Sequence, residues 1–201
     1  AEAGARVLMR GGNAVDDAMA AALVQGDVDP QMCGIAGFGC AHVYLPKIGV
    51  HECIDFHGNT PLGATPDMWS NLIEGETRDG FGFVLKDFVN DLGYQSITTP
   101  GSLKAYHTAI EDYGTWDWSD ICQPAVKQAE KGFIVRPHVH FWWTQGAAFG
   151  RAEVTDRLRF SPIGREIYFR SDGSIKRVGD HVSNPDLAHT LSLIADGGSS
   201  I

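Results

Sequence analysis

The first part of the chain places apolar residues at helical spacing in two successive stretches. Residues 1–10 predict a helix that ends at Gly11, because glycine closes a last turn in the left-handed conformation without a steric penalty. Asn13 then predicts the N-cap of a second helix, and Asp16 and Asp17 fall in its first turn, where the helix dipole favours negative charge. The apolar face of this second helix comprises Val15, Met19, Ala22 and Leu23.

Two strand-like segments follow the second helix. Residues 38–44 and 50–56 have the spacing and composition of strands, and residues 45–49 form a turn-rich connection of hairpin length between them. We therefore expect these two strands to pair in the antiparallel direction.

Helical spacing returns in the second half of the chain, where helices are predicted over residues 102–113, 137–148 and 184–197. Residues 118–131 are also helical in pattern, but Pro124 predicts an interruption, because proline suits the first turn of a helix better than its interior. The remaining segments predict a surface excursion with one short helix over residues 66–93 and a strand pair over residues 168–178.

The order of these elements and the composition indicate a single folded domain. Helices lie on either side of glycine-rich strands without regular strand–helix alternation, which is typical of an α+β fold. The sequence has 201 residues, of which 43% are apolar and 20% charged, enough to form a substantial buried core. We expect residues 1–201 to form one domain.

The charge and the apolar runs narrow the class of partner. A net charge of -9 repels nucleic-acid phosphates and anionic lipid headgroups, so small-molecule or protein partners are favoured over nucleic acid. No run of about 18 apolar residues and no leader-like segment occurs, so the sequence predicts no membrane-spanning segment. Because Ala1 already falls within a helical pattern, we expect the true N-terminus to lie upstream, and the compartment stays open between periplasmic, secreted and cytoplasmic.

Cysteine and histidine spacing gives no metal site. No C-x-x-C pair occurs among the cysteines, which are Cys33, Cys40, Cys53 and Cys122. We therefore expect buried thiols and not disulfides or metal ligands. His42 and His51 flank the predicted hairpin without a third ligand at suitable spacing. His138 and His140 diverge if their segment is helical, since residues two apart on a helix point in different directions. We predict neither a metal nor an organic cofactor.

Several short motifs occur in an order that identifies a family resemblance. The most specific combine the capped helix start at residues 11–16 with the glycine-rich segment at residues 29–39. The later motifs are Ile54–Phe56 with Pro61, Ala64–Met68, Thr99–Ser102, Tyr113–Gly114, Pro124–Val126, Gly132–Phe133 and Asn184–Ala188. Together they resemble, over nearly the whole chain, the large subunit of the gamma-glutamyltranspeptidases.

The resemblance implies a fold, a chemistry and a partner. Members of this family are N-terminal-nucleophile hydrolases with a four-layer αββα sandwich, and this chain would be an N-terminal part of the large subunit, completed by a small subunit that is missing here. The precursor cuts itself, and the new N-terminal threonine of the small subunit attacks a small-molecule amide. No catalytic residue is therefore expected in this chain, and Thr98–Thr99 is assigned to a turn or helix cap.

The clearest departure from the family pattern is at His57. Transpeptidases usually carry Arg-Glu in place of His57–Gly58, and by resemblance that arginine binds the α-carboxylate of the glutamyl group. Histidine lacks the two-pronged charged donor of arginine and is mostly uncharged at pH 7. A hydrogen bond to a charged group is worth roughly 1.5–3 kcal/mol, so its loss should weaken a glutamyl donor by about one to two decades. We assign His57 to substrate binding, with a structural role as the alternative.

A second departure is Phe38, which stands where the family carries glycine. Its ring would either narrow the pocket or point into the core, and we expect the core, since aromatic residues in strands are usually buried.

The leading hypothesis is an amidohydrolase or acyltransferase of gamma-glutamyltranspeptidase type with a non-standard acyl donor. The first alternative is a true gamma-glutamyltranspeptidase or glutathione hydrolase, in which another cation such as Arg78 replaces the missing arginine. The second is a catalytically silent binding or scaffold homologue.

Overall fold

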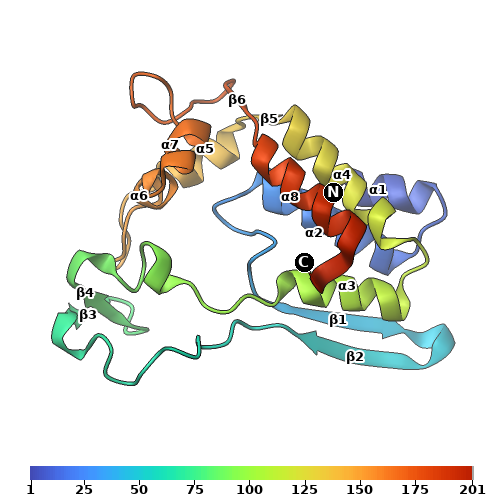
Figure 1. The fold of residues 1–201 in the computed structure, drawn as a ribbon, viewed down its shortest axis with the longest axis horizontal. Coiled ribbons are helices and arrows are strands. Elements are labelled where there is room, and N and C mark those ends of the chain that lie inside the picture. Colours follow the sequence, from blue (N-terminus) through green and yellow to red (C-terminus); the bar gives the residue numbers. More distant parts are fainter. Residues whose placement is uncertain (201) are drawn as a thin grey trace. The chain divides into compact units, whose positions relative to one another are not determined.

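A computed structural model describes residues 1–200 (Figure 1). These residues form two compact units. Unit 1 comprises residues 1–59, 100–133 and those from 183 onward, and unit 2 comprises residues 60–99 and 134–182. Two compact units need not fold independently, so the expectation of one domain stays a prediction.

Unit 1 consists of helices and one β-hairpin, and Figure 1 shows the helices together on one side of the hairpin. The helices are α1 (Glu2–Met9), α2 (Ala14–Val28), α3 (Ser102–Tyr113), α4 (Trp118–Lys131) and α8 (Pro185–Gly197), followed by the 3₁₀ turn η5 (Gly198–Ser200). The hairpin consists of β1 (Cys40–Leu45) and β2 (Val50–Asp55), joined through η1 (Pro46–Ile48). The predicted boundaries of α1, α3 and α8, the predicted start of α2 and the predicted hairpin are confirmed within about two residues.

The hairpin packs against the helices with one face only. Its strands pair antiparallel, with Cys40 opposite Asp55 and Leu45 opposite Val50. On the inner face Val43 is buried in a core that also contains Leu23 of α2. The outer face is exposed and carries Cys40, His42, Tyr44, His51, Cys53 and Asp55. The hairpin therefore has an open face and two unpaired strand edges among the described residues.

This open face corrects the cysteine prediction. Cys122 is buried as expected, and burial raises the pKa of its thiol to about 12. Cys40 and Cys53 are exposed, so the prediction is wrong for them. Strand alternation places both thiols on the outer face, and no other described element covers that face.

Helix α4 corrects a second prediction, because it runs through Pro124 without interruption. Proline in a helix interior removes one backbone hydrogen bond and costs about 3 kcal/mol. The buried face of α4, which packs against α2 and α8, comprises Ile121, Cys122, Ala125, Val126 and Ala129. Burial of this continuous face offsets the local cost, so packing outweighs the local preference.

Unit 2 has more regular structure than the sequence pattern predicts. Its elements are η2 (Ser70–Leu72), β3 (Ile73–Glu76), β4 (Phe83–Leu85), η3 (Lys86–Phe88), η4 (Tyr94–Ser96), α5 (Pro137–Trp143), α6 (Val154–Arg159) and α7 (Pro162–Tyr168). Strands β3 and β4 pair antiparallel where one short helix was predicted, and a further two-stranded sheet joins β5 (Phe133–Ile134) to β6 (His181–Val182). The predicted strand pair at residues 168–178 is reduced to one bridge between Phe169 and Ile175.

A buried carboxylate joins the start of α2 to the connection between α3 and α4. Asp16 is fully buried and completes a capping box with Asn13, whose backbone N–H donates to it at 2.7 Å. From about 100 residues away, Thr115 donates its N–H at 2.9 Å and its hydroxyl at 2.6 Å, and Trp116 donates its N–H at 3.3 Å. Burial alone would raise the pKa of Asp16, but these hydrogen bonds outweigh it and lower the pKa.

We expect Asp16→Asn to lower the free energy of unfolding at pH 7 by about 3 kcal/mol, because an amide accepts fewer of these hydrogen bonds and places an NH₂ group against N–H donors. The lowered folded-state pKa gives stability that is present above the unfolded pKa near 3.8 and is lost as pH falls through the folded pKa. Urea unfolding at pH 7 and pH 3 of the complete protein should therefore show a smaller difference at pH 3.

The control is Asp112→Asn, an exposed carboxylate at the end of α3, which should change stability by less than about 0.5 kcal/mol. Equal effects of the two substitutions would contradict a special role for the buried carboxylate.

Candidate functional site

The end of β2 holds the residue that the sequence assigns to substrate binding. The strand pairing continues one step beyond β2, where Phe56 and Gly39 exchange backbone hydrogen bonds of 3.0 and 3.3 Å. The ring of Phe56 lies against Gly39, where a Cβ atom would come within 3.1 Å of it. A Cβ on Gly101 would lie 2.8 Å from the Phe56 carbonyl oxygen, so the close approach of this residue requires glycine at position 101. The backbone that precedes His57 is therefore held in place at the end of the hairpin.

Asp55 orients the His57 ring. Its Oδ1 atom accepts the backbone N–H of His57 at 3.0 Å and lies 2.9 Å from the ring Nδ1. The backbone hydrogen bond, followed by the ring contact, lowers the pKa of Asp55, so it is a carboxylate at neutral pH. Both side chains remain accessible, at 65% exposure for His57 and 74% for Asp55. The pair can thus contact a ligand.

This contact determines which hydrogen bonds the ring can offer. A carboxylate only accepts, so the neutral His57 ring must carry its proton on Nδ1 to bond Asp55. Its Nε2 atom is then an acceptor, and becomes a donor only when the ring is protonated. In the neutral state, His57 therefore offers no ring donor to a substrate carboxylate while it bonds Asp55. The sequence analysis did not identify Asp55 as the residue that orients His57. The signal that could have found it is the Asp two residues before His57, a typical pattern for a side-chain-to-backbone turn.

Phe38 lies beside His57 and not in the core. The two ring centroids are 5.9 Å apart, and Phe38 is 66% exposed. The expectation that this ring is buried is therefore wrong, because the outer side of the hairpin has no covering layer among the described residues. Phe38 and His57 together form an aromatic surface above the end of the hairpin.

Of the other sequence candidates, His42 and His51 belong to the same unit as His57, and the remaining ones belong to unit 2. The His42 and His51 rings lie at a tilt of 46°, with centroids 4.8 Å apart, on the open face of the hairpin. His138 and His140 lie on α5, and Arg78 is exposed on the β3–β4 turn. Among residues 1–200, no three or more His, Cys, Asp or Glu side chains are grouped so as to hold a metal ion.

The helices of the described chain are too short or too polar for a bilayer span.

Comparison with known sequences identifies related proteins. The family model described as Gamma-glutamyltranspeptidase matches residues 1–200. Acylase ACY 1 proenzyme from Pseudomonas sp. (strain V22) is 36% identical over 98% of this chain and 33% of its own length. Glutathione hydrolase proenzyme from Bacillus subtilis (strain 168) is 30% identical over 98% of this chain and 31% of its own length. The chain thus spans about a third of the length of these curated relatives.

A solved structure agrees with these sequence matches. Helicobacter pylori gamma-glutamyltranspeptidase superposes with a TM-score of 0.81 at 26% identity, covering 98% of this chain and 51% of that chain. The mixed helix-and-sheet fold predicted from the sequence is confirmed as the fold of the corresponding part of these enzymes. The chain belongs to the gamma-glutamyltranspeptidase family.

Proposed function

We propose that this chain is an N-terminal part of the large subunit of an N-terminal-nucleophile amidohydrolase or acyltransferase. The nucleophile would be the N-terminal threonine of a small subunit cut from the same precursor, and it would form an acyl-enzyme with an amide substrate. Family membership, the name proenzyme on two relatives and the one-third coverage of their length support this assignment. The open face and free edges of the β1–β2 hairpin suit a further sheet supplied by the rest of the precursor.

We further propose that His57 lines the acyl pocket and that the preferred acyl group lacks an α-carboxylate. The single observation that carries this proposal is the contact between His57 Nδ1 and Asp55. It leaves the neutral ring with an acceptor at Nε2, and an acceptor repels a carboxylate where an arginine would bind it in two places. Phe38 adds an apolar neighbour to the same surface. The amide bond would still be cleaved by the small subunit.

A true glutathione hydrolase is the second candidate, supported by the similarity to glutathione hydrolases. In that case a cation at a position other than 57 would bind the α-carboxylate in place of the missing arginine. A catalytically silent homologue is the third candidate, which predicts no turnover of any amide and a replaced threonine at the start of the small subunit.

The complete processed protein should prefer 4-aminobutyryl-p-nitroanilide to γ-glutamyl-p-nitroanilide, which carries the α-carboxylate as its only difference. We expect the higher kcat/KM for the 4-aminobutyryl compound, because the Nε2 acceptor of His57 disfavours the carboxylate. An arginine at this position would favour the γ-glutamyl compound by about one to two decades. A strong preference for γ-glutamyl would support the glutathione hydrolase, and no release of p-nitroaniline from any acyl donor would support the silent homologue.

His57→Arg should raise kcat/KM for γ-glutamyl-p-nitroanilide about tenfold, mainly by lowering KM, because guanidinium provides the charged two-pronged donor. The 4-aminobutyryl compound should be unaffected. A suitable control is His138→Arg, which adds the same charge at an exposed position of unit 2. Unchanged kinetics in His57→Arg would place this residue outside the pocket.

A further inference from the structure

Unit 2 contains a small open hollow. Its volume is about 200 Å³. Two segments line it, one around η4 and one at the α6–α7 junction. The lining residues are Leu92, Gly93, Tyr94, Ile97, Arg157, Phe160 and Ser161.

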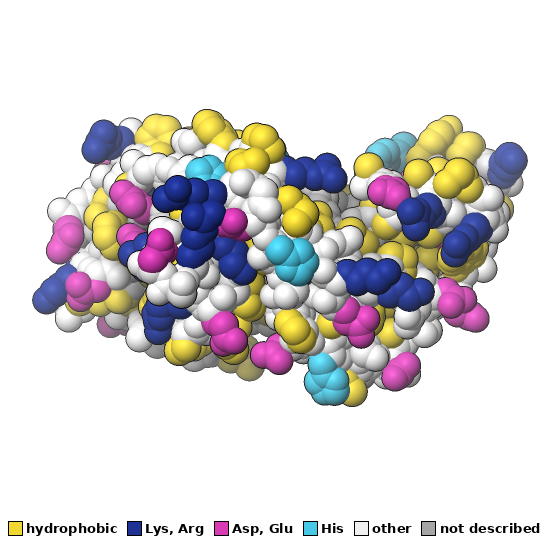
Figure 2. Space-filling model, turned by 90° about the horizontal axis from the view of Figure 1, so that it is seen from above, with side chains coloured by type: hydrophobic (Ala, Val, Ile, Leu, Met, Phe, Trp, Pro, Cys, Tyr) yellow, Lys and Arg dark blue, Asp and Glu magenta, His cyan; other side chains and the backbone are white. Residues whose placement is uncertain are grey.

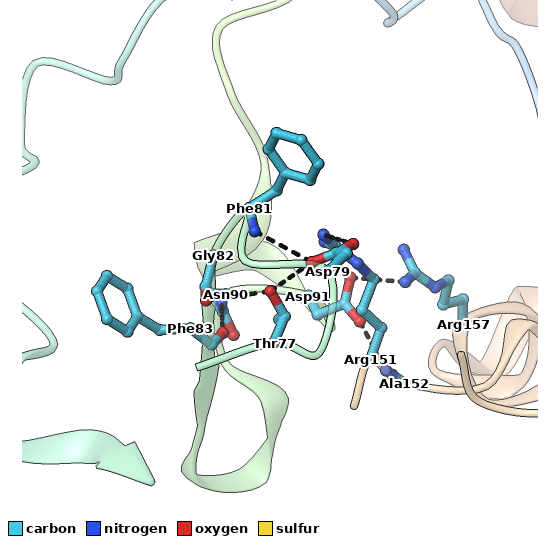
Figure 3. Close-up of polar contacts among 10 residues, drawn as sticks. All are labelled: Thr77, Asp79, Phe81, Gly82, Phe83, Asn90, Asp91, Arg151, Ala152 and Arg157. Atoms are coloured by element: carbon cyan, nitrogen blue, oxygen red, sulfur yellow. Dashed lines mark hydrogen bonds and ion pairs between the residues drawn. The ribbon is translucent and has the colours of Figure 1, made fainter. Parts of the chain in front are cut away.

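Two acidic side chains fix the spacing of the segments that line the hollow (Figure 3). Asp91 accepts the backbone N–H of Ala152 at 2.7 Å and pairs with Arg157 at 2.6 Å. Asp79 pairs with Arg151 at 3.1 Å. These bonds tie the start of α6 to residues 79–91, so the hollow lies between segments that are held together by polar contacts.

The walls of the hollow are apolar and unusually accessible. Tyr94 is 79% exposed, Ile97 is 55% exposed and Phe160 is 46% exposed. The Tyr94 and Phe160 rings meet edge to face at 5.8 Å. The Phe160 ring lies directly on Gly93, where a Cβ would come within 2.5 Å of it. Leaving such side chains in water sacrifices about 25 cal/mol for each Å² of apolar surface, and grouped exposure of this kind often marks a binding site.

Arginine side chains lie near the hollow, although the chain as a whole is acidic and Asp156 and Glu166 flank these arginines in the sequence. Arg157, Arg159 and Arg165 lie within nine residues of one another in the sequence. Arg165 donates to the backbone oxygens of Arg159 at 2.6 Å and Phe160 at 3.3 Å, which places its guanidinium beside the hollow. Of these three arginines, only Arg157 pairs with a carboxylate among the described residues. Figure 2 shows Lys and Arg side chains mixed with Asp and Glu side chains over the face of the molecule seen from this side.

We propose that this hollow is a binding site for a small carboxylate that carries a single aromatic or alicyclic ring. An apolar cavity of about 150 Å³ accommodates benzene, so the volume here suits one ring with a short chain. The ring would pack on Tyr94, Ile97 and Phe160. The carboxylate would reach the exposed part of the Arg157 guanidinium, with Arg165 adding positive charge. Its occupation requires no amide cleavage.

The test is to titrate three small probes into the complete protein and to measure their binding by calorimetry and by saturation-transfer NMR. The probes are 3-phenylpropanoate, 3-phenylpropan-1-ol with the same ring but no charge, and propanoate with the charge but no ring. We expect 3-phenylpropanoate to bind with a Kd of about 1 mM, as is usual for a ligand of this size. The alcohol should bind about tenfold more weakly, and propanoate should show no measurable binding.

Three variants assign the binding to this hollow. Tyr94→Ser removes a wall that is largely exposed, so the fold should be retained while the affinity for 3-phenylpropanoate falls at least fivefold. Arg157→Gln can still donate to Asp91, and it should reduce the affinity for 3-phenylpropanoate to that of the alcohol. Arg136→Gln, an equal loss of charge outside the hollow, should bind like the unmodified protein. Absence of binding up to 20 mM, equal binding of acid and alcohol, or unchanged affinity in Tyr94→Ser would overturn the proposal.

Discussion

The buried Asp16 carboxylate is the constraint on which the arrangement of unit 1 depends. A charge removed from water costs several kcal/mol unless donors surround it, and here Asn13, Thr115 and Trp116 supply them. These donors fix the start of α2 against the end of α3. The start of α3 is in turn attached to the glycine-rich segment, because the N–H groups of residues 101 and 102 both donate to the carbonyl of Gly37. The strand that follows pairs with β2, so the position of His57 depends on contacts that begin at Asp16.

The sequence predicts well those features whose cause is local. Asn13 sits at a cap, and the turn residues at 46–49 set a hairpin, because each signal acts within a few residues. Features that depend on distant packing were not predictable in this way. Pro124 stays inside a helix because its flanking residues are buried by α2 and α8, and Phe38 is exposed because nothing described covers the hairpin there. The β3–β4 hairpin was missed because its strands are short and β3 is interrupted by Gly75.

For the candidate site, the sequence locates a departure from the family pattern and the structure gives it chemical meaning. Replacement of arginine by histidine implies only the loss of a two-pronged donor. The Asp55 contact adds that the remaining accessible ring nitrogen of the neutral His57 is an acceptor. These two changes act differently on a substrate. An acceptor at this position disfavours a carboxylate, whereas the loss of a donor only removes a favourable contact with it. Discrimination against a substrate group usually requires such an unfavourable contact as well as the absence of a favourable one.

The two units are stabilised in different ways, which bears on where further ligands can bind. Unit 1 buries a continuous apolar core, with Ala20, Ile121 and Ala125 fully inaccessible. Unit 2 has ion pairs that join segments far apart in the sequence, such as those of Asp79 and Asp91, while many of its aromatic side chains remain accessible. Charged pairs set the geometry of segments without covering apolar surface, so the rings near η4 and α7 stay exposed at a fixed spacing. That combination of held backbone and uncovered rings is what a preformed small-molecule site requires.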